Sequence, residues 1–154
     1  MVCMPISVKY VHTSIVARDW KSLSQFYVNA LACRRKPPER NLKGAWLDKA
    51  TSLNGAHIKG IHLRLPGYGS EGPTLEIFQY SRVKKGALAA INKPGYAHVA
   101  FLVHNVARAL EKLERHGGRR LGQVVSATIE GVGSINFVYA RDPEGNIIEL
   151  QKWG

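Results

Sequence analysis

The chain has 154 residues, of which 45% are hydrophobic and 21% charged. This is typical of one globular domain and excludes a disordered tail. The apolar runs are too short for a membrane-spanning helix, and the N-terminus does not resemble a secretory signal. The cysteines, Cys3 and Cys33, predict neither a disulfide framework nor a zinc pair, so we expect a cytoplasmic protein. Arg34 and Arg35 follow Cys33, which leaves open whether its thiol is activated or buried and inert.

The net charge of +11 reflects 22 Lys and Arg against 11 Asp and Glu and makes nucleic acid a candidate partner. The cations are spread over segments such as 34–43, 84–85 and 115–120, and many are expected where helices end and turns begin. No RNA-binding, basic-zipper or zinc-finger motif accompanies them. We therefore expect a small, anionic ligand rather than nucleic acid or a membrane.

The first half of the chain predicts a strand, a helix and further strands. A strand at 10–16 carries His12, and apolar residues at helical spacing between Trp20 and Leu31 predict a helix capped by Asp19. An extra helical turn or two is expected within 41–53. Strands follow at 57–65 and at 74–80, the second with Glu76 among apolar residues.

The second half repeats this pattern. A strand at 96–102 carries His98, and the next helix is expected to begin at Asn105 and stop at Gly117-Gly118. Strands follow at 121–128, 134–141 and 147–153, the last carrying Glu149. The segment 142–146, Asp-Pro-Glu-Gly-Asn, predicts a turn before the final strand.

These two halves predict one α+β domain, 1–154, built from two similar modules. The histidines are 86 residues apart and the glutamates 73, so the first half holds 13 more residues, which an insertion near 41–53 explains. Module 1 is expected at about 6–82 and module 2 at about 95–154, with a linker at about 83–94.

Two histidines and two glutamates occupy matched positions in the repeat: His12, Glu76, His98 and Glu149. Both glutamates lie on largely apolar strands, where a buried carboxylate needs a cation, a proton or a metal. A lone strand histidine is usually a hydrogen-bonded core residue and a lone glutamate usually faces solvent, but the joint occurrence favours one divalent ion held by all four. Imidazole and carboxylate suit Zn, Ni, Co, Mn or Fe(II).

These four residues in this order, and the segment 140–150 (Ala-Arg-Asp-Pro-Glu-Gly-Asn-Ile-Ile-Glu-Leu), resemble the vicinal oxygen chelate superfamily. It includes glyoxalase I, methylmalonyl-CoA epimerase, extradiol dioxygenases, and fosfomycin and bleomycin resistance proteins. The resemblance implies two paired βαβββ modules whose sheets curl around a metal in a U-shaped cleft, and a homodimer.

It also implies a divalent-metal-dependent lyase or isomerase of the glyoxalase type, which moves a proton next to a carbonyl of a small, anionic substrate. Glu149 is the first candidate base and Glu76 the second. A carboxylate at position 76 is similar to glyoxalase I, whereas the epimerase usually carries glutamine there. Candidate substrate-binding residues are Trp46, Phe78, Tyr80, Tyr139 and Arg141. Val16 and Tyr80 stand where the bacterial glyoxalase carries arginine and asparagine that hold glutathione, which puts glutathione in doubt.

Two alternatives stay open at this point. An extradiol ring-cleaving dioxygenase would hold Fe(II) with His12, His98 and Glu149, with His57 or His62 as an acid–base histidine. A protein of the bleomycin-resistance type would bind a drug or metabolite without chemistry, although the positive charge argues against a cationic drug.

Overall fold

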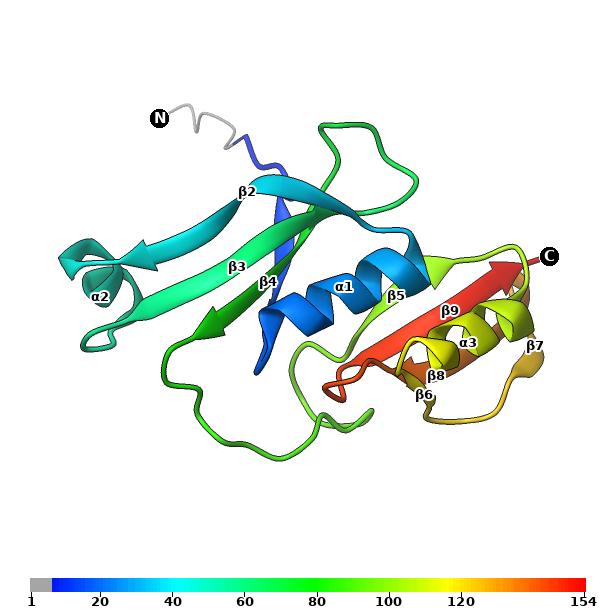
Figure 1. Cartoon of the computed structure of the whole chain (residues 1–154). Helices are drawn as coiled ribbons and strands as arrows, with labels where there is room; N and C mark the ends of the chain where they lie inside the picture. Colours follow the sequence, from blue (N-terminus) through cyan, green and yellow to red (C-terminus); the bar gives the residue numbers. More distant parts are fainter. Residues whose placement is uncertain (1–6) are drawn as a thin grey trace, which may run out of the picture.

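The computed structural model describes residues 7–154, so Cys3 and the N-terminal stretch compared with a secretory signal lie outside the described residues. Figure 1 shows how the elements are arranged. They are, in chain order, β1 (His12–Val16), α1 (Trp20–Leu31), β2 (Arg34–Lys43), α2 (Ala45–Thr51), β3 (His57–Arg64), β4 (Thr74–Tyr80), β5 (His98–Leu102), α3 (Val106–Arg115), β6 (Arg119–Arg120), β7 (Val125–Ile129), β8 (Gly133–Arg141) and β9 (Ile147–Trp153).

The strands form two sheets of matching topology. The first has the order β1-β4-β3-β2, and the second has the order β5-β9-β8-β6, with β7 also paired to β8. In each sheet the first strand runs parallel to the last strand of its module, and the remaining pairs are antiparallel. The predicted α+β fold and the predicted repeat of its elements are therefore confirmed.

Local capping explains where the two longer helices begin. The Asp19 side chain accepts hydrogen bonds from the backbone N–H groups of Lys21 and Ser22, which have no partner inside α1. The Asn105 side chain accepts one from Arg108 at the start of α3. Helix α3 ends at Arg115, two residues before the left-handed Gly117, so the predicted caps and stop are confirmed.

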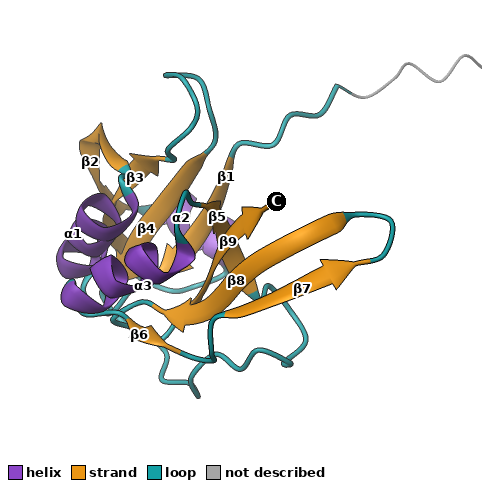
Figure 2. Cartoon of the chain, turned by 90° about the vertical axis from the view of Figure 1, so that its right-hand side faces the viewer, coloured by secondary structure: helices purple, strands orange, loops and turns teal. Residues whose placement is uncertain are grey.

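Helices α1 and α3 lie side by side against the sheets (Figure 2), and one continuous core joins the two modules. Alternate strand residues point to opposite faces of a sheet. On each sheet the residues that point toward the helices are apolar. The fully buried ones include Leu63, Leu75 and Ile77 in the first sheet and Val138, Ile148 and Leu150 in the second. Each contributes about 1.5–3 kcal/mol through burial. The opposite faces of the sheets are left for polar groups.

The strand β2 was missed in the sequence, where its cations were expected at helix ends and turns. This strand of ten residues contains Pro37, Pro38 and five basic residues, a composition that does not suggest a strand. It lies at the edge of its sheet, where proline removes no ladder hydrogen bond and charges discourage pairing with another chain. A bulge between Lys36 and Arg40 interrupts its pairing with β3. Its counterpart in module 2 is split into β6 and β7, so a strand begins at Val125 rather than at 121.

Helix α2 lies within the stretch 41–53 that carries the additional residues of module 1. Its Leu47 packs with Ala56, Ile58 and Phe78 in a small cluster separate from the main core. Figure 1 shows α2 at the outer end of the first sheet, away from module 2.

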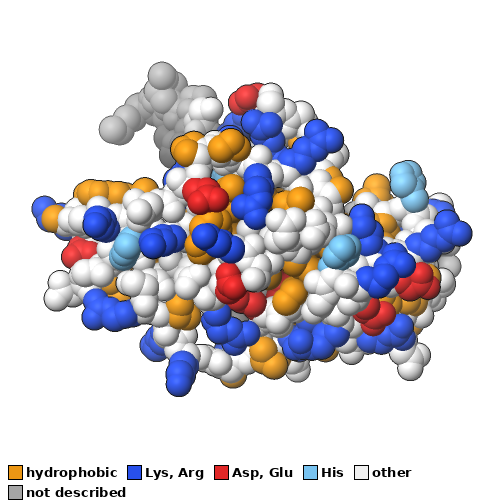
Figure 3. Space-filling model, viewed as in Figure 1, with side chains coloured by type: hydrophobic (Ala, Val, Ile, Leu, Met, Phe, Trp, Pro, Cys, Tyr) orange, Lys and Arg blue, Asp and Glu red, His pale blue; other side chains and the backbone are white. Residues whose placement is uncertain are grey.

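Lys and Arg side chains are scattered over both modules on the face shown in Figure 3 rather than gathered in one patch. Among residues 7–154, no helix combines the length and the apolar character needed to cross a bilayer.

Candidate functional site

The face of each sheet that the helices leave uncovered carries the predicted ligands. Along β1 and along β5, exposed residues alternate with half-buried ones, and His12 and His98 are on the exposed side. Glu76 on β4 and Glu149 on β9 interrupt runs of buried residues, and their side chains are only 12% and 13% exposed. Each glutamate is thus aimed away from the apolar core, into a partly sheltered polar position.

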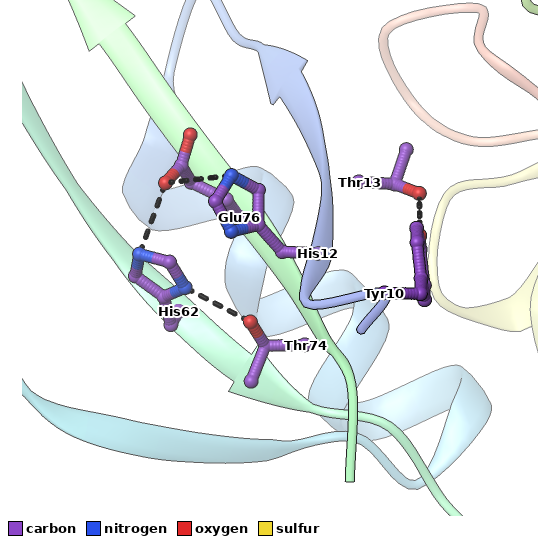
Figure 4. Close-up of polar contacts among 6 residues, drawn as sticks. All are labelled: Tyr10, His12, Thr13, His62, Thr74 and Glu76. Carbon is purple, nitrogen blue, oxygen red and sulfur yellow. Dashed lines mark hydrogen bonds and ion pairs between the residues drawn. The ribbon is translucent and has the colours of Figure 1, made fainter. Parts of the chain in front are cut away.

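In the first sheet, Glu76 lies between two histidines (Figure 4). Its Oε2 atom is 3.0 Å from His62 Nε2 and 3.7 Å from His12 Nε2. The other ring nitrogen of His62, Nδ1, is 2.9 Å from Thr74 Oγ1, which fixes the orientation of the ring. The rings of His12 and His62 meet edge-on, with centroids 5.4 Å apart.

In the second sheet, His98 Nε2 lies 2.9 Å from Glu149 Oε2. The Tyr139 ring stands 5.2 Å from the His98 ring, between centroids. Tyr139 is directly opposite Glu149 in the pairing of β8 with β9, so the three side chains share one face. Within each module the two candidate ligands are neighbours: His12 contacts Glu76, and His98 contacts Glu149.

The two sheets place these pairs at equivalent positions. Glu76 is opposite Ser14, two residues after His12, and Glu149 is opposite Ala100, two residues after His98. The same correspondence matches His62, opposite Glu76 on β3, with Tyr139, opposite Glu149 on β8. In the sequence, His62 was considered only as an acid–base candidate. Pairing the strand that carries it with the Glu76 strand would have placed His62 on the same sheet face as Glu76.

Burial and neighbouring charges shift two pKa values here. The pKa of His62 lies below its usual value, chiefly because burial disfavours the charged ring. Arg40, His12 and Lys36 lower it further, while Glu76 acts in the opposite direction. Burial, and then the Glu149 carboxylate, raise the pKa of the Tyr139 hydroxyl. The lowered pKa favours the neutral ring, which is the form in which a histidine binds a metal ion.

The donor atoms of His12, His62 and Glu76 all lie within 4.8 Å of one another, close enough to bind a single metal ion. The donor set, two imidazoles and one carboxylate, fits a divalent transition metal. Among the described residues, His98 and Glu149 do not join this group, and they remain a separate pair. One chain therefore holds a three-donor cluster and a two-donor pair.

The candidate substrate-binding residues are dispersed. Phe78 is buried, with its ring 5.8 Å from that of His62, and Tyr139 touches His98. Tyr80 is half-buried against the small apolar cluster around Leu47, and Trp46 is exposed on α2. Arg141 is held elsewhere: its Nη1 donates hydrogen bonds to the carbonyls of Ala89 in the linker and Gly145 in the last turn.

The turn that precedes β9 is organised by buried Asp142. Its Oδ1 accepts hydrogen bonds from the backbone N–H groups of Glu144 and Asn146, and its Oδ2 accepts one from Asn146 Nδ2. The Glu144 carboxylate accepts from the backbone N–H groups of Arg18 and Asp19 before α1. The turn of module 2 is thus docked on module 1, directly before β9, the strand that carries Glu149.

His57, the other acid–base candidate, lies outside this site. Its Nε2 is 2.6 Å from Asn41 Oδ1, at the outer end of the first sheet. A cavity of about 680 Å³ between β1 and β5 is lined by residues such as Thr13 and Phe101, and none of the four predicted ligands lines it.

A family model described as Glyoxalase/Bleomycin resistance protein/Dioxygenase superfamily matches residues 9–150. The chain belongs to this superfamily. Members of the superfamily typically bind a metal ion and small-molecule substrates, and often form dimers. The proposed resemblance is thereby confirmed at the level of the superfamily.

Solved structures of glyoxalase-superfamily proteins share the fold. A glyoxalase family protein from Bacillus cereus is 19% identical, with 98% of this chain and 96% of that chain covered and a TM-score of 0.71. The trypanothione-dependent glyoxalase I of Leishmania major is 22% identical, covering 95% and 87%, with a TM-score of 0.62. A glyoxalase I variant from Zea mays is 19% identical, covering 93% and 44%, with a TM-score of 0.63. At these identities the likeness is one of fold.

One curated relative shares part of the sequence. The glyoxalase domain-containing protein RDO1 of Mycosarcoma maydis is 35% identical in an alignment of 69 residues that covers 42% of this chain. The match spans only 37% of the relative's own length.

Proposed function

We propose that this superfamily member is a divalent-metal-dependent lyase or isomerase of the glyoxalase type. The reaction would move a proton next to a carbonyl of a small, anionic substrate. One observation carries the proposal: a histidine–glutamate pair recurs at equivalent register positions of the two sheets, on the uncovered face of each. A structural role for a single pair would not require its repetition in the other module.

The metal would be held by His12, Glu76, His98 and Glu149, with Zn, Ni, Co or Mn as the ions that best suit these donors. Bound there, it would supply positive charge to stabilise an enolate oxygen. The carboxylate of Glu149, or in second place that of Glu76, would accept the substrate proton and return it to the neighbouring carbon. Tyr139, opposite Glu149, is in place to orient the substrate.

A four-donor site of this kind would form between two copies of the chain. The two pairs are separate clusters within one chain, so a second copy would bring the His98 pair of one chain to the His12 pair of the other. Exposed apolar residues on the sheet faces that carry His12 and His98 support such a dimer. Val16 on the His12 strand is 54% exposed and Leu102 on the His98 strand is 74% exposed, and a second copy seated there would cover both.

The test is metal analysis and a substrate screen on protein prepared without an affinity tag. We expect about one Zn, Ni, Co or Mn per chain, and turnover of ketoaldehyde–thiol adducts or thioesters. Glu149→Gln removes a proposed ligand as well as the proposed base, so it is compared with wild type at equal metal occupancy, where its kcat should be at least about 100-fold lower. His104→Gln, a change at an exposed histidine outside both clusters, is the matched control and should behave as wild type. Metal bound without any turnover would instead favour a sequestering protein.

The His12–His62–Glu76 cluster favours one second candidate, an extradiol-type dioxygenase. Two histidines and one carboxylate are the donor set of non-haem Fe(II) oxygenases. In this case iron would be the bound metal, His62→Gln would lower iron content, and catechols would be cleaved with uptake of dioxygen. In the glyoxalase-type site His62 is not a ligand, so His62→Gln should leave metal content unchanged. His57→Gln, on the same strand but bound to Asn41, controls for loss of a histidine from β3.

A further inference from the structure

A second cavity, of about 250 Å³, adjoins the His12–His62–Glu76 cluster. His62 belongs to both, and Thr74, which is bonded to His62 Nδ1, also lines the cavity. Its remaining wall comes from the segment before β1, from β2, and from the loop between β3 and β4: Lys9, Tyr10, Val11, Lys36, Arg40, Glu71 and Gly72. The volume is below that of a drug-sized pocket and suits a small chemical group.

The bulge in β2 concentrates two of the cations at this place. Lys36 is opposite His62, and Arg40 is opposite Gly60. Four residues along β2 thus span only two residues along β3, which draws Lys36 and Arg40 together. Because directly opposite residues project to the same face, both cations lie on the face that carries His62 and Glu76. Arg35 has the other orientation and bonds Gln25 of α1.

The cavity has an excess of positive charge. Lys9, Lys36 and Arg40 face one carboxylate in its wall, that of Glu71. Among residues 7–154, none of these three cations forms an ion pair with a carboxylate, and the Arg40 side chain bonds only the carbonyl of Pro38. Arginine offers a planar fork of donors and lysine a mobile point charge, a combination that binds carboxylate and phosphate groups.

We propose that Lys36 and Arg40, assisted by Lys9, form an oxyanion-binding subsite for a carboxylate or phosphate group of the substrate. The carbonyl of the same molecule would then lie at the His12–His62–Glu76 cluster, since His62 borders both places. The substrate class is therefore a short carbonyl compound with an anionic group a few bonds from the reacting carbon. The placement of the carbonyl rests on the proposed function, whereas the binding of the anion does not.

The test is calorimetric titration of chelator-treated, metal-free protein with three probes: succinate, inorganic phosphate and neutral succinamide. We expect saturable binding of succinate or phosphate at one site per chain, weakened by added salt, and no binding of succinamide. Preference for succinate would assign a carboxylate group, and preference for phosphate a phosphoryl group. Saturable binding of succinamide as tight as that of succinate would overturn the proposal.

The double variant Lys36→Gln/Arg40→Gln should bind the preferred anion at least about tenfold more weakly, because each charge-assisted contact is lost. Lys43→Gln removes one charge from the same strand at a position opposite His57, on the other face, and should stay within about twofold of wild type. Circular dichroism and the melting temperature show whether the double variant is folded. Equal anion affinity in a folded double variant and in wild type would refute the subsite.

A failure of the proposed function is distinguishable from a failure of the subsite. Glu149→Gln tests the reaction and should leave anion binding by metal-free protein unchanged. Loss of anion binding in the double variant without any turnover in wild type would keep the subsite and reject the reaction. With an anionic substrate in hand, the double variant should raise KM much more than it lowers kcat, as expected for a group that binds the substrate without reacting.

Discussion

Tyr27 of α1 donates a hydrogen bond of 2.9 Å to Oδ2 of Asp142, a residue 115 positions later in the last turn of module 2. Both side chains are fully buried. Burial raises the pKa values of both groups, and the neighbouring Asp142 carboxylate raises that of Tyr27 further. This contact ties the helix of one module to the turn that leads into the Glu149 strand of the other.

Asp142→Ala should lower the free energy of unfolding by about 3 kcal/mol, because it leaves the buried Tyr27 hydroxyl and two partly buried backbone N–H groups without an acceptor. Tyr27→Phe removes one of these hydrogen bonds and keeps the packing, so it should cost about 1 kcal/mol. Urea unfolding of both variants measures the difference. If Asp142→Ala cost no more than Tyr27→Phe, the turn would be held by other contacts.

A mixture of His12→Ala and His98→Ala proteins should recover metal binding that neither has alone. If each site takes one pair from each copy, a mixed dimer contains one site with both histidines intact. Random exchange of subunits would then restore about a quarter of the wild-type sites. Metal analysis after co-refolding measures this recovery.

The matched control mixes His12→Ala with Glu76→Gln. Both changes fall in the same pair, so every site in every dimer remains damaged and no recovery is expected. A site closed within one chain would give no recovery in either mixture.

Gly60→Ala should destabilise the first sheet by about 1–3 kcal/mol, the usual cost of overpacking. A Cβ at this position would overlap the Ile77 carbonyl oxygen and the Phe78 ring. The ring of Phe78 would be displaced, and with it the edge contact to His62. Gly86→Ala, in the linker, has no neighbouring atom within 4 Å and serves as the control. Equal urea midpoints for the two variants would contradict the close packing at Gly60.

Cys33 should be unreactive in the folded protein, since its side chain is 2% exposed and burial raises its pKa to about 12. The possibility that Arg34 and Arg35 activate it is thus not borne out. In a Cys3→Ser variant, Ellman's reagent at pH 8 should label Cys33 only after urea is added. Rapid labelling of the native variant would be incompatible with a buried thiol.

The raised pKa of Cys33 also predicts how stability changes with pH. In the unfolded chain the thiol ionises near its ordinary pKa of 9.0, whereas the folded thiol keeps its proton to about pH 12. Above pH 9 the folded state therefore binds more protons, and stability falls as the pH rises. Cys33→Ala should remove this component of the alkaline loss in urea unfolding.

The sequence predicted the elements that have a strong local pattern. Apolar spacing and a capping side chain located α1 and α3, and an apolar strand with one glutamate located β4 and β9. It missed β2, because edge strands tolerate the prolines and charges that are typical of turns elsewhere. The cations of this strand were consequently counted as scattered, although Lys36 and Arg40 share a cavity.

The sequence by itself determined the repeat, the helix caps, and the matched positions of the two histidine–glutamate pairs. Only the tertiary structure decided that His62 contacts Glu76, that Arg141 binds the linker and the last turn, and that Asp142 meets Tyr27. The physical reason is the separation along the chain of the residues that interact. Capping and alternation depend on neighbours within one element, whereas strand register and the docking of helices join residues far apart in the chain and depend on how the whole core packs.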